Sequence, residues 1–235
     1  FVNKMAYGYS YASCPKIQIP RFGIDLDADD FCGFIEDRED RILGSTPERG
    51  DVVVFRHPID GTDFIKRLVG LPGDRIQVTA GILHINDVAV VLEPDGTFNE
   101  VFEPQGPFRN VPLCREGGVG VNANCSKLRY TETLPGGTSH SILKVYDATN
   151  PRAALGGSPD DTRVYTVPEG HFFFMGDNRD NSQDSRAVQR SGGGVGFVPL
   201  KDIVGRADRI VFSAAGRSMF AFWTWRGDRF FKAVD

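Results

Sequence analysis

Residues 51–56 read DVVVFR and residues 171–175 read HFFFM, and these two runs decide the fold class. Short runs of Val, Ile and Phe favour β-strands over helices. Further runs of this kind occupy residues 75–79, 82–85, 88–92, 163–167 and 208–212. Turn-forming residues bound them, among them Leu-Pro-Gly-Asp at 71–74, Asn-Asp at 86–87 and Pro-Asp-Gly at 94–96. Because the connections are too short for crossover helices, the sequence predicts an all-β, antiparallel chain.

Apolar runs are closely spaced in the first and last parts of the sequence, and the middle third is more polar and richer in loops. Residues 93–107 are acidic and contain proline, residues 115–124 are rich in Gly and Asn, and residues 153–161 are small and polar. Residues 82–88 (ILHINDV) predict a hairpin with Asn86-Asp87 near its turn. We therefore predict an antiparallel β core domain, residues 1–74 and 169–235, interrupted by a smaller, loop-rich β domain at residues 75–168.

Charge and hydropathy exclude two classes of protein. The 27 basic and 31 acidic side chains give a net charge of -4, so nothing in the balance favours nucleic acid as a partner. The longest apolar runs, residues 88–92 and 219–223, are far shorter than the about 20 residues of a membrane-spanning helix. The chain begins at Phe1 without the features of a signal peptide, so we expect that a preceding segment was removed.

The cysteines and histidines predict no metal site and no cofactor. Cys14, Cys32, Cys114 and Cys125 form no C-x-x-C pair, and the four histidines are scattered. Cys114 and Cys125 flank a polar stretch and can close a loop in an oxidising compartment. Two free thiols are the alternative, and the sequence leaves both open.

The C-terminal tail, residues 219–231 (MFAFWTWRGDRFF), combines six aromatic side chains with Arg226 and Arg229. Aromatic rings and cations at this density suit a membrane interface. A closing strand packed on the core is the alternative.

Lys66 is the first candidate for chemistry, because it follows Phe64-Ile65 in a run that predicts a strand. On an apolar surface its ammonium is desolvated, which lowers the pKa and makes the amine a usable base. The alternative is a surface lysine whose ammonium reaches water.

The second candidate is the polar loop, residues 176–186 (GDNRDNSQDSR), directly after the apolar run 171–175. Functional sites are often built where strands end. A calcium loop fits poorly: counting from Asp180, the sixth position is Ser185 instead of Gly and the twelfth is Ser191 instead of Glu. Asp184 and Arg186 are spaced to share a face of a strand and to pair. A purely structural loop is the alternative.

Other catalytic patterns find no support. The sequence has no G-x-S-x-G for a Ser-His-Asp triad, and residues 192–196 (GGGVG) lack the Lys and Ser/Thr of a phosphate loop.

Together these pieces resemble the bacterial type I signal peptidases (leader peptidases), membrane-bound proteases with a serine-lysine dyad. Three sequence motifs of the family occur in the family's order, at residues 49–55 (RGDVVVF), 66–76 (KRLVGLPGDRI) and 176–186. Similarity continues at residues 1–8 (FVNKMAYG) and 129–138 (RYTETLPGGT). The family fold is likewise an antiparallel β core interrupted by a second β domain.

The resemblance implies a role for each matching residue of the dyad's surroundings. Lys66 matches the general base, which deprotonates a serine and later activates the deacylating water. Ser182 matches the serine that orients this lysine by a hydrogen bond, and Arg67 matches a supporting position. Asp184 and Arg186 match an ion pair that holds the loop under the site.

The resemblance also implies the substrate and the location. Phe64 and Ile65 match residues that line shallow pockets for the small side chains of an Ala-x-Ala pattern before the cleavage point. The expected partners are the signal peptides of exported preproteins and the membrane surface, with no nucleic acid and a monomeric state. The domain is expected on the periplasmic side of the bacterial inner membrane.

One departure concerns the nucleophile. The family's Ser-Met-x-Pro-Thr box occurs nowhere in the 235 residues. We expect it, with the membrane anchor, upstream of Phe1, and we expect this exact chain to be inactive. The alternatives are a non-catalytic homologue that binds signal peptides, a specialised peptidase of a secretion or conjugation system, and a self-cleaving repressor. No DNA-binding helix pair supports the last.

Overall fold

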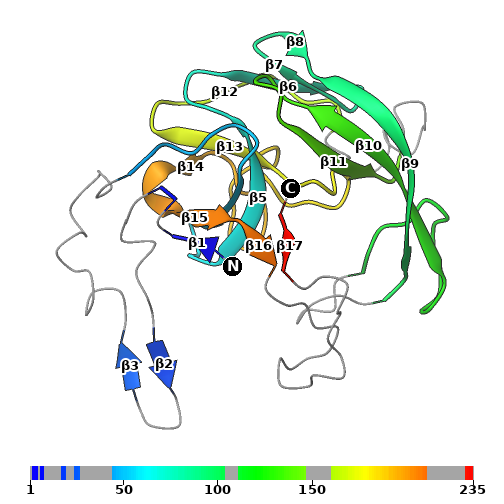
Figure 1. Ribbon diagram of the computed structural model, residues 1–235, viewed down its shortest axis with the longest axis horizontal. Helices are drawn as coiled ribbons and strands as arrows, with labels where there is room; N and C mark the ends of the chain where they lie inside the picture. Colours follow the sequence, from blue (N-terminus) through cyan, green and yellow to red (C-terminus); the bar gives the residue numbers. More distant parts are fainter. Residues whose placement is uncertain are drawn as a thin grey trace.

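The computed structural model describes residues 2–4, 6–7, 44–103, 111–146, 160–210 and 231–234, and residues 17–19 and 24–26 by their backbone alone. All pairs of named strands in this part of the chain are antiparallel, so the predicted all-β class is confirmed (Figure 1). Cys14, Cys32 and tail residues 219–230 lie outside the described residues.

The elements, in chain order, are β1 (Val2–Asn3), β2 (Ile17–Ile19), β3 (Ile24–Leu26), β4 (Val52–Arg56), β5 (Asp63–Gly70), β6 (Arg75–Thr79), β7 (Ile82–Ile85), β8 (Val88–Ala89), β9 (Val91–Val101), β10 (Asn124–Thr133), β11 (Ser139–Lys144), β12 (Tyr165–Thr166), β13 (His171–Met175), β14 (Val198–Pro199), the 3-10 helix η4 (Leu200–Asp202), β15 (Ile203–Ala207), β16 (Arg209–Ile210) and β17 (Lys232–Ala233). No helix in the described ranges is both long and apolar enough to cross a bilayer.

The central sheet has the strand order β1-β15-β4-β5-β13-β14. Its β4 and β5 form a hairpin in which Val53 lies opposite Lys66. On the other side of β5, β13 pairs with residues 67–70 only. The polar loop leaves the end of β13, and this topology therefore brings it beside Lys66.

A second sheet has the order β12-β6-β7-β8. Its β7 and β8 form the predicted hairpin, with Ile85 opposite Val88. Asn86 and Asp87 at the turn have φ angles of 54° and 66°. Positive φ at both central residues is typical of a type I′ turn, which matches the twist of the two strands.

The third sheet, β11-β10-β9, corrects one expectation. Pro94-Asp95-Gly96 predicts a turn, and the structure instead has a bulge inside the long strand β9: Pro94 pairs with Tyr130 and Thr97 pairs with Leu128, so Asp95 and Gly96 share the place opposite a single residue. Gly96 takes the positive φ of 79° that such a bulge needs. Because β9 is an edge strand, the missing N–H of Pro94 is tolerated.

The remaining predicted strands lie at the expected positions in the described residues, but their observed lengths differ from the predicted ones. The run 88–92 is divided between β8 and β9, and the run 163–167 is observed as the shorter β12. In the run 208–212, β16 covers residues 209–210, and residues 211–212 lie outside the described residues. Cys114 and Cys125, which the sequence left undecided, form a disulfide.

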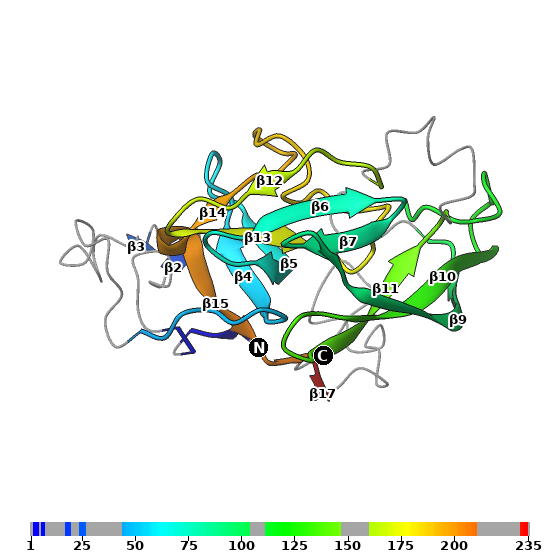
Figure 2. The same cartoon turned by 90° about the horizontal axis from the view of Figure 1, so that it is seen from above.

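Two apolar clusters hold the sheets together. One packs β4, β5 and β13 from one side, with Phe55, Leu68 and Phe174 at its centre. The other combines Phe173 and Met175 of β13 with buried residues of β6 and β7. Figures 1 and 2 show the β9–β11 sheet at the opposite end of the molecule from β14 and β15. The second cluster draws on both predicted domains, and the domain boundaries stay a prediction.

Candidate active site

Lys66 lies in the first half of β5, on the same face of the strand as Phe64. Its Nζ is 5.9 Å from the centre of the Phe64 ring. Burial lowers the pKa of the Lys66 ammonium, because desolvation outweighs the opposing charges of Asp184 and Asp177. Neither carboxylate lies within ion-pair distance of Lys66, so a neutral amine is accessible closer to physiological pH than in an ordinary lysine.

Ser182 approaches Lys66 across Gly176, the first residue after β13. A Cβ at Gly176 would lie 2.1 Å from Ser182 Oγ and 3.7 Å from Lys66 Cδ. Only glycine therefore leaves room for the hydroxyl beside the lysine stem. Ser182 Oγ is buried and has no hydrogen-bond partner within the described ranges, so the hydrogen bond to Lys66 that the resemblance implies is not formed in this structure.

Arg67 points to the opposite face of β5 and binds the start of the polar loop. Its guanidinium makes two hydrogen bonds of 2.9 Å to the carboxylate of Asp177 and donates a third, of 2.8 Å, to the carbonyl of Gly50. The arginine is buried, and this geometry fixes the residue after Gly176 to the strand that carries Lys66.

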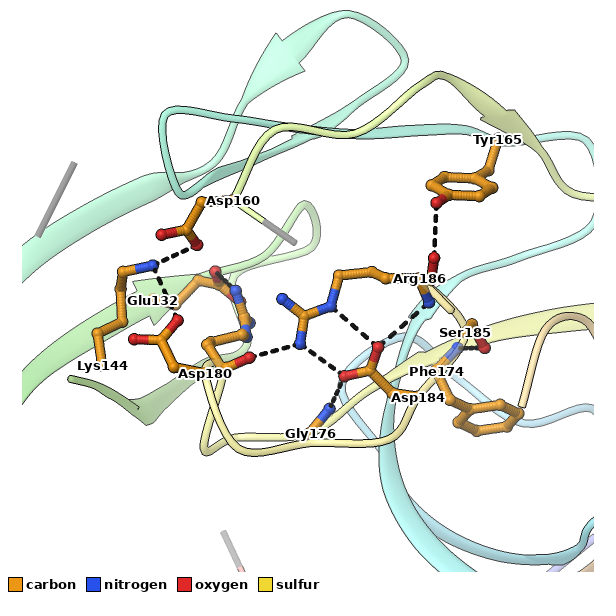
Figure 3. Close-up of polar contacts among 11 residues, drawn as sticks. Glu132, Lys144, Asp160, Tyr165, Phe174, Gly176, Asp180, Asp184, Ser185 and Arg186 are labelled. Carbon is orange, nitrogen blue, oxygen red and sulfur yellow. Dashed lines mark hydrogen bonds and ion pairs between the residues drawn. The ribbon is translucent and has the colours of Figure 1, made fainter. Parts of the chain in front are cut away.

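Asp184 and Arg186 pair with each other at the far end of the loop (Figure 3). Arg186 Nε and Nη2 lie 2.9 and 2.7 Å from the two carboxylate oxygens, and the Gly176 N–H donates to Asp184 at 3.0 Å. Burial alone would raise the pKa of Asp184, but the charge and hydrogen bonds of Arg186 outweigh it and lower the pKa. The pair closes the loop back onto Gly176.

Phe64 and Ile65 differ in their surroundings. Phe64 is half-buried and stacks on Phe55 with a centroid distance of 6.1 Å, whereas Ile65 is 53% exposed. Neither residue lines the cavities of about 680 and 360 Å³, which other described residues surround.

Sequence reasoning left three charged residues of this region without a role. Arg179 and Asp180 belong to the polar loop, and Glu132 belongs to the stretch 129–138; the structure pairs Arg179 with Glu132. A buried acid in a strand is a signal for such a pair, but burial could not be read from the sequence. In the part of the chain that the structure describes, no group of His, Cys, Asp and Glu is arranged to hold a metal ion.

Comparisons with known proteins extend over most of the chain. Residues 1–212 match the family described as "Signal peptidase, peptidase S26". Signal peptidase I of Rickettsia typhi (strain ATCC VR-144 / Wilmington) is 34% identical over 218 residues, which are 91% of this chain and 64% of that protein. Signal peptidase I of Rickettsia canadensis (strain McKiel) is 35% identical with the same coverage. The chain thus spans 64% of the length of these relatives.

A crystal structure of a signal peptidase I from Enterococcus faecalis V583 is 23% identical and covers 69% of this chain and 97% of that chain, with a TM-score of 0.33.

Proposed function

Because this chain belongs to the signal peptidase family, peptidase S26, we propose that the whole protein is a membrane-associated serine endopeptidase. It releases N-terminal signal peptides from exported preproteins by cleavage after an Ala-x-Ala-like motif. The observation that carries the proposal is the desolvated Lys66 beside the buried hydroxyl of Ser182. A lysine held in this way is suited to act as a general base.

In the proposed reaction, neutral Lys66 Nζ accepts the proton of a serine hydroxyl while the serine oxygen bonds to the carbonyl carbon of the substrate. The lysine ammonium then gives this proton to the leaving amine as the C–N bond breaks, which leaves an acyl ester. Lys66 next takes a proton from the water that hydrolyses the ester. The described residues contain no Ser-Met-x-Pro-Thr box, so the serine itself is not assigned.

Ser182, Arg67, Asp184 and Arg186 are proposed to support this base. Within the described residues, Ser182 Oγ has an unused donor and acceptor beside the lysine stem, and we expect it to hydrogen-bond Nζ when substrate excludes water. The two arginines neutralise the acids nearest to Lys66. We expect these four residues to orient the amine and to keep it unpaired.

The substrate is proposed to bind as an extended strand beside Phe64 and Ile65. The first half of β5 pairs with β4 on one side, while β13 reaches only residues 67–70 on the other. Within the described residues, the second side of residues 63–66 therefore keeps free backbone groups, to which a peptide can add by main-chain hydrogen bonds. The half-buried Phe64 and the exposed Ile65 then bound shallow pockets for small side chains.

The proposed location is the periplasmic side of the bacterial inner membrane. The Cys114–Cys125 disulfide supports an oxidising compartment. The aromatic and basic tail, residues 219–231, is the proposed contact with lipid.

The test uses the full-length gene product in detergent with a preprotein substrate. Replacing Lys66 by Ala should lower kcat/KM by about 10²- to 10⁴-fold, the usual contribution of a general base, with little change in Tm. Lys201→Ala, at an exposed lysine, is the control and should leave cleavage unchanged. Activity of the wild type should rise with pH as Lys66 loses its proton, with a midpoint below the ordinary lysine value of about 10.4.

Full activity of Lys66→Ala would refute the mechanism. A wild-type protein that binds signal peptides and cleaves none would instead be the non-catalytic homologue. The 235-residue chain alone should not cleave, since it lacks the box that holds the family's nucleophile.

A further inference from the structure

The polar loop is held from outside by an acid of the β9–β11 sheet. Arg179, in the middle of the loop, makes a two-fold contact with the carboxylate of Glu132 on β10: Nη1 lies 2.8 Å from Oε1, and Nη2 bonds Oε2. Both side chains are buried. Burial alone would raise the pKa of Glu132, but the charge and hydrogen bonds of Arg179, together with the buried His140 at 3.3 Å, outweigh it and lower the pKa to about 2. Glu132 is therefore a fixed anion in this pair.

The same stretch of loop is fixed to β11 by its backbone. The Leu143 N–H donates to the Asp177 carbonyl at 2.8 Å, and the Arg179 N–H donates to the Leu143 carbonyl at 2.9 Å. The Asp180 carboxylate accepts the N–H groups of residues 145 and 146 at 2.7 and 3.1 Å, and Lys144 bridges Asp180 and Asp160 (Figure 3). Residues 177–180 therefore lie in register with the β9–β11 sheet.

A continuous series of bonds leads from Arg179 to the lysine. The Arg179 carbonyl accepts Arg186 Nη2 at 2.7 Å, and Arg186 holds Asp184. Asp184 in turn accepts the N–H of Gly176, the residue against which Ser182 and the Lys66 stem pack. The charged members of the series, Arg179, Asp184 and Arg186, are buried, so water does not replace the partners that they would lose.

We infer that Glu132 is a positioning residue of the proposed active site: through Arg179 it sets the loop conformation that presents Ser182 and Asp184 to Lys66. This inference rests on the proposed function. It also gives the β9–β11 sheet a role in catalysis.

Charge gives Glu132 a second influence on the site. Asp177 and Asp184 both attract Arg179, and both already bind another arginine. When Glu132 loses its charge, the buried charge of Arg179 has no counter-charge from Glu132. Arg179 then attracts the carboxylates of Asp177 and Asp184 more strongly. The groups that act on Lys66 are these same acids and Arg186, so the change reaches the lysine amine.

The experiment compares Glu132→Gln and Glu132→Asp in the full-length protein with Glu100→Gln as the matched control. Glu100 of β9 pairs with the buried Lys127, which lies on β10 like Glu132. Loss of the Glu100 charge therefore also leaves a buried cation without its counter-charge in this sheet. Among the residues that the structure describes, Lys127 pairs with Glu100 and not with the polar loop. Preprotein cleavage gives kcat and KM. The pH dependence of Lys66 acetylation, measured by mass spectrometry, gives the pH at which the Lys66 amine loses its proton, independently of cleavage.

Glu132→Gln should lower kcat about 10- to 100-fold, as expected for a small misplacement of reacting groups, with KM within about two-fold. The Lys66 acetylation midpoint should move to lower pH, since a negative charge is removed. Glu132→Asp keeps the charge, should fold, and should recover part of kcat. Glu100→Gln should lower Tm and leave both kcat and the Lys66 midpoint unchanged.

Two results would overturn the inference: an unchanged Lys66 midpoint in Glu132→Gln, or equal losses of kcat in Glu132→Gln and Glu100→Gln. Failure of the proposed function would look different. The wild type would then cleave nothing, while the Lys66 midpoint would still decide whether Glu132 acts on the lysine.

Discussion

Replacing Asp184 by Asn tests whether the buried ion pair holds the polar loop. The substitution keeps the shape of the side chain and removes its charge. The Asp184 carboxylate accepts four hydrogen bonds, two from the Arg186 guanidinium, one from the Arg186 N–H and one from the Gly176 N–H. In the variant, the buried Arg186 keeps the Arg179 carbonyl as a partner and loses its counter-charge.

Breaking a buried pair from one side typically costs about 3–5 kcal/mol, because an uncompensated charge stays in the interior. For a chain of this size each kcal/mol lowers Tm by about 2–4 °C, so the expected fall is roughly 6–20 °C. The measurement is denaturant and thermal unfolding of the 235-residue chain at pH 7. Asp87→Asn is the matched control: Asp87 pairs with Arg75 at 2.6 Å on the surface, where a pair contributes only about 0–1 kcal/mol.

The pH dependence gives a second check on the same pair. The pKa of Asp184 is lower in the folded state than in the unfolded state, so its contribution to stability is complete above the unfolded value of about 3.9. It is lost as the pH falls from there toward the folded pKa. The difference in the free energy of unfolding between wild type and Asp184→Asn should be constant from about pH 5 to 7 and should become smaller below about pH 4. An Asp184→Asn variant no less stable than Asp87→Asn would refute this reasoning.

Two further substitutions each test one feature. Gly176→Ala should lower kcat of the full-length protein, because its Cβ would lie 2.1 Å from Ser182 Oγ. The control is Gly118→Ala, which has open space around it and should leave kcat unchanged. Equal kcat values for the two variants would contradict the close approach of Ser182 to Gly176. Cys114→Ser with Cys125→Ser should lower the free energy of unfolding by about 3 kcal/mol, the loop-closure contribution of a disulfide of this span, measured against the wild type with and without reductant. An unchanged stability would show that the bond constrains little.

Local rules predicted the class of fold and several turns. The runs at 51–56, 75–79 and 82–85 are strands that bury alternate side chains, and the run at 171–175 is a strand that buries all but His171. Both patterns are visible in the sequence. The turn at Asn86-Asp87 was also predictable, since few residues accept positive φ at two positions in a row. At Pro94-Asp95-Gly96 the same rules failed. There the pairing of β9 with β10 over its whole length overrides the local turn preference and converts it into a bulge.

The site could be predicted only in part, for a related reason. Lys66 and the loop 176–186 were recognisable as candidates, because a lysine among apolar residues and a polar stretch after a strand are local features. The partner of Arg179 lies 47 residues away, on another sheet. Long-range pairing of this kind depends on register between sheets, which composition and spacing do not reveal. The sequence therefore showed which residues the loop contains and not what holds it.

The polar loop presents Lys66 with a physical difficulty, because it carries three aspartates, and two of them, Asp177 and Asp184, act on an amine that must be neutral to serve as a base. A free carboxylate at contact distance would raise the lysine pKa and abolish that role. The structure commits each acid elsewhere: Asp177 to Arg67, Asp184 to Arg186, and Asp180 to backbone N–H groups and Lys144. Desolvation therefore prevails at Lys66. Arg67 of β5 and Arg186 of the loop are needed for this reason as much as for the shape of the loop, and removing either of them would release an aspartate toward the lysine.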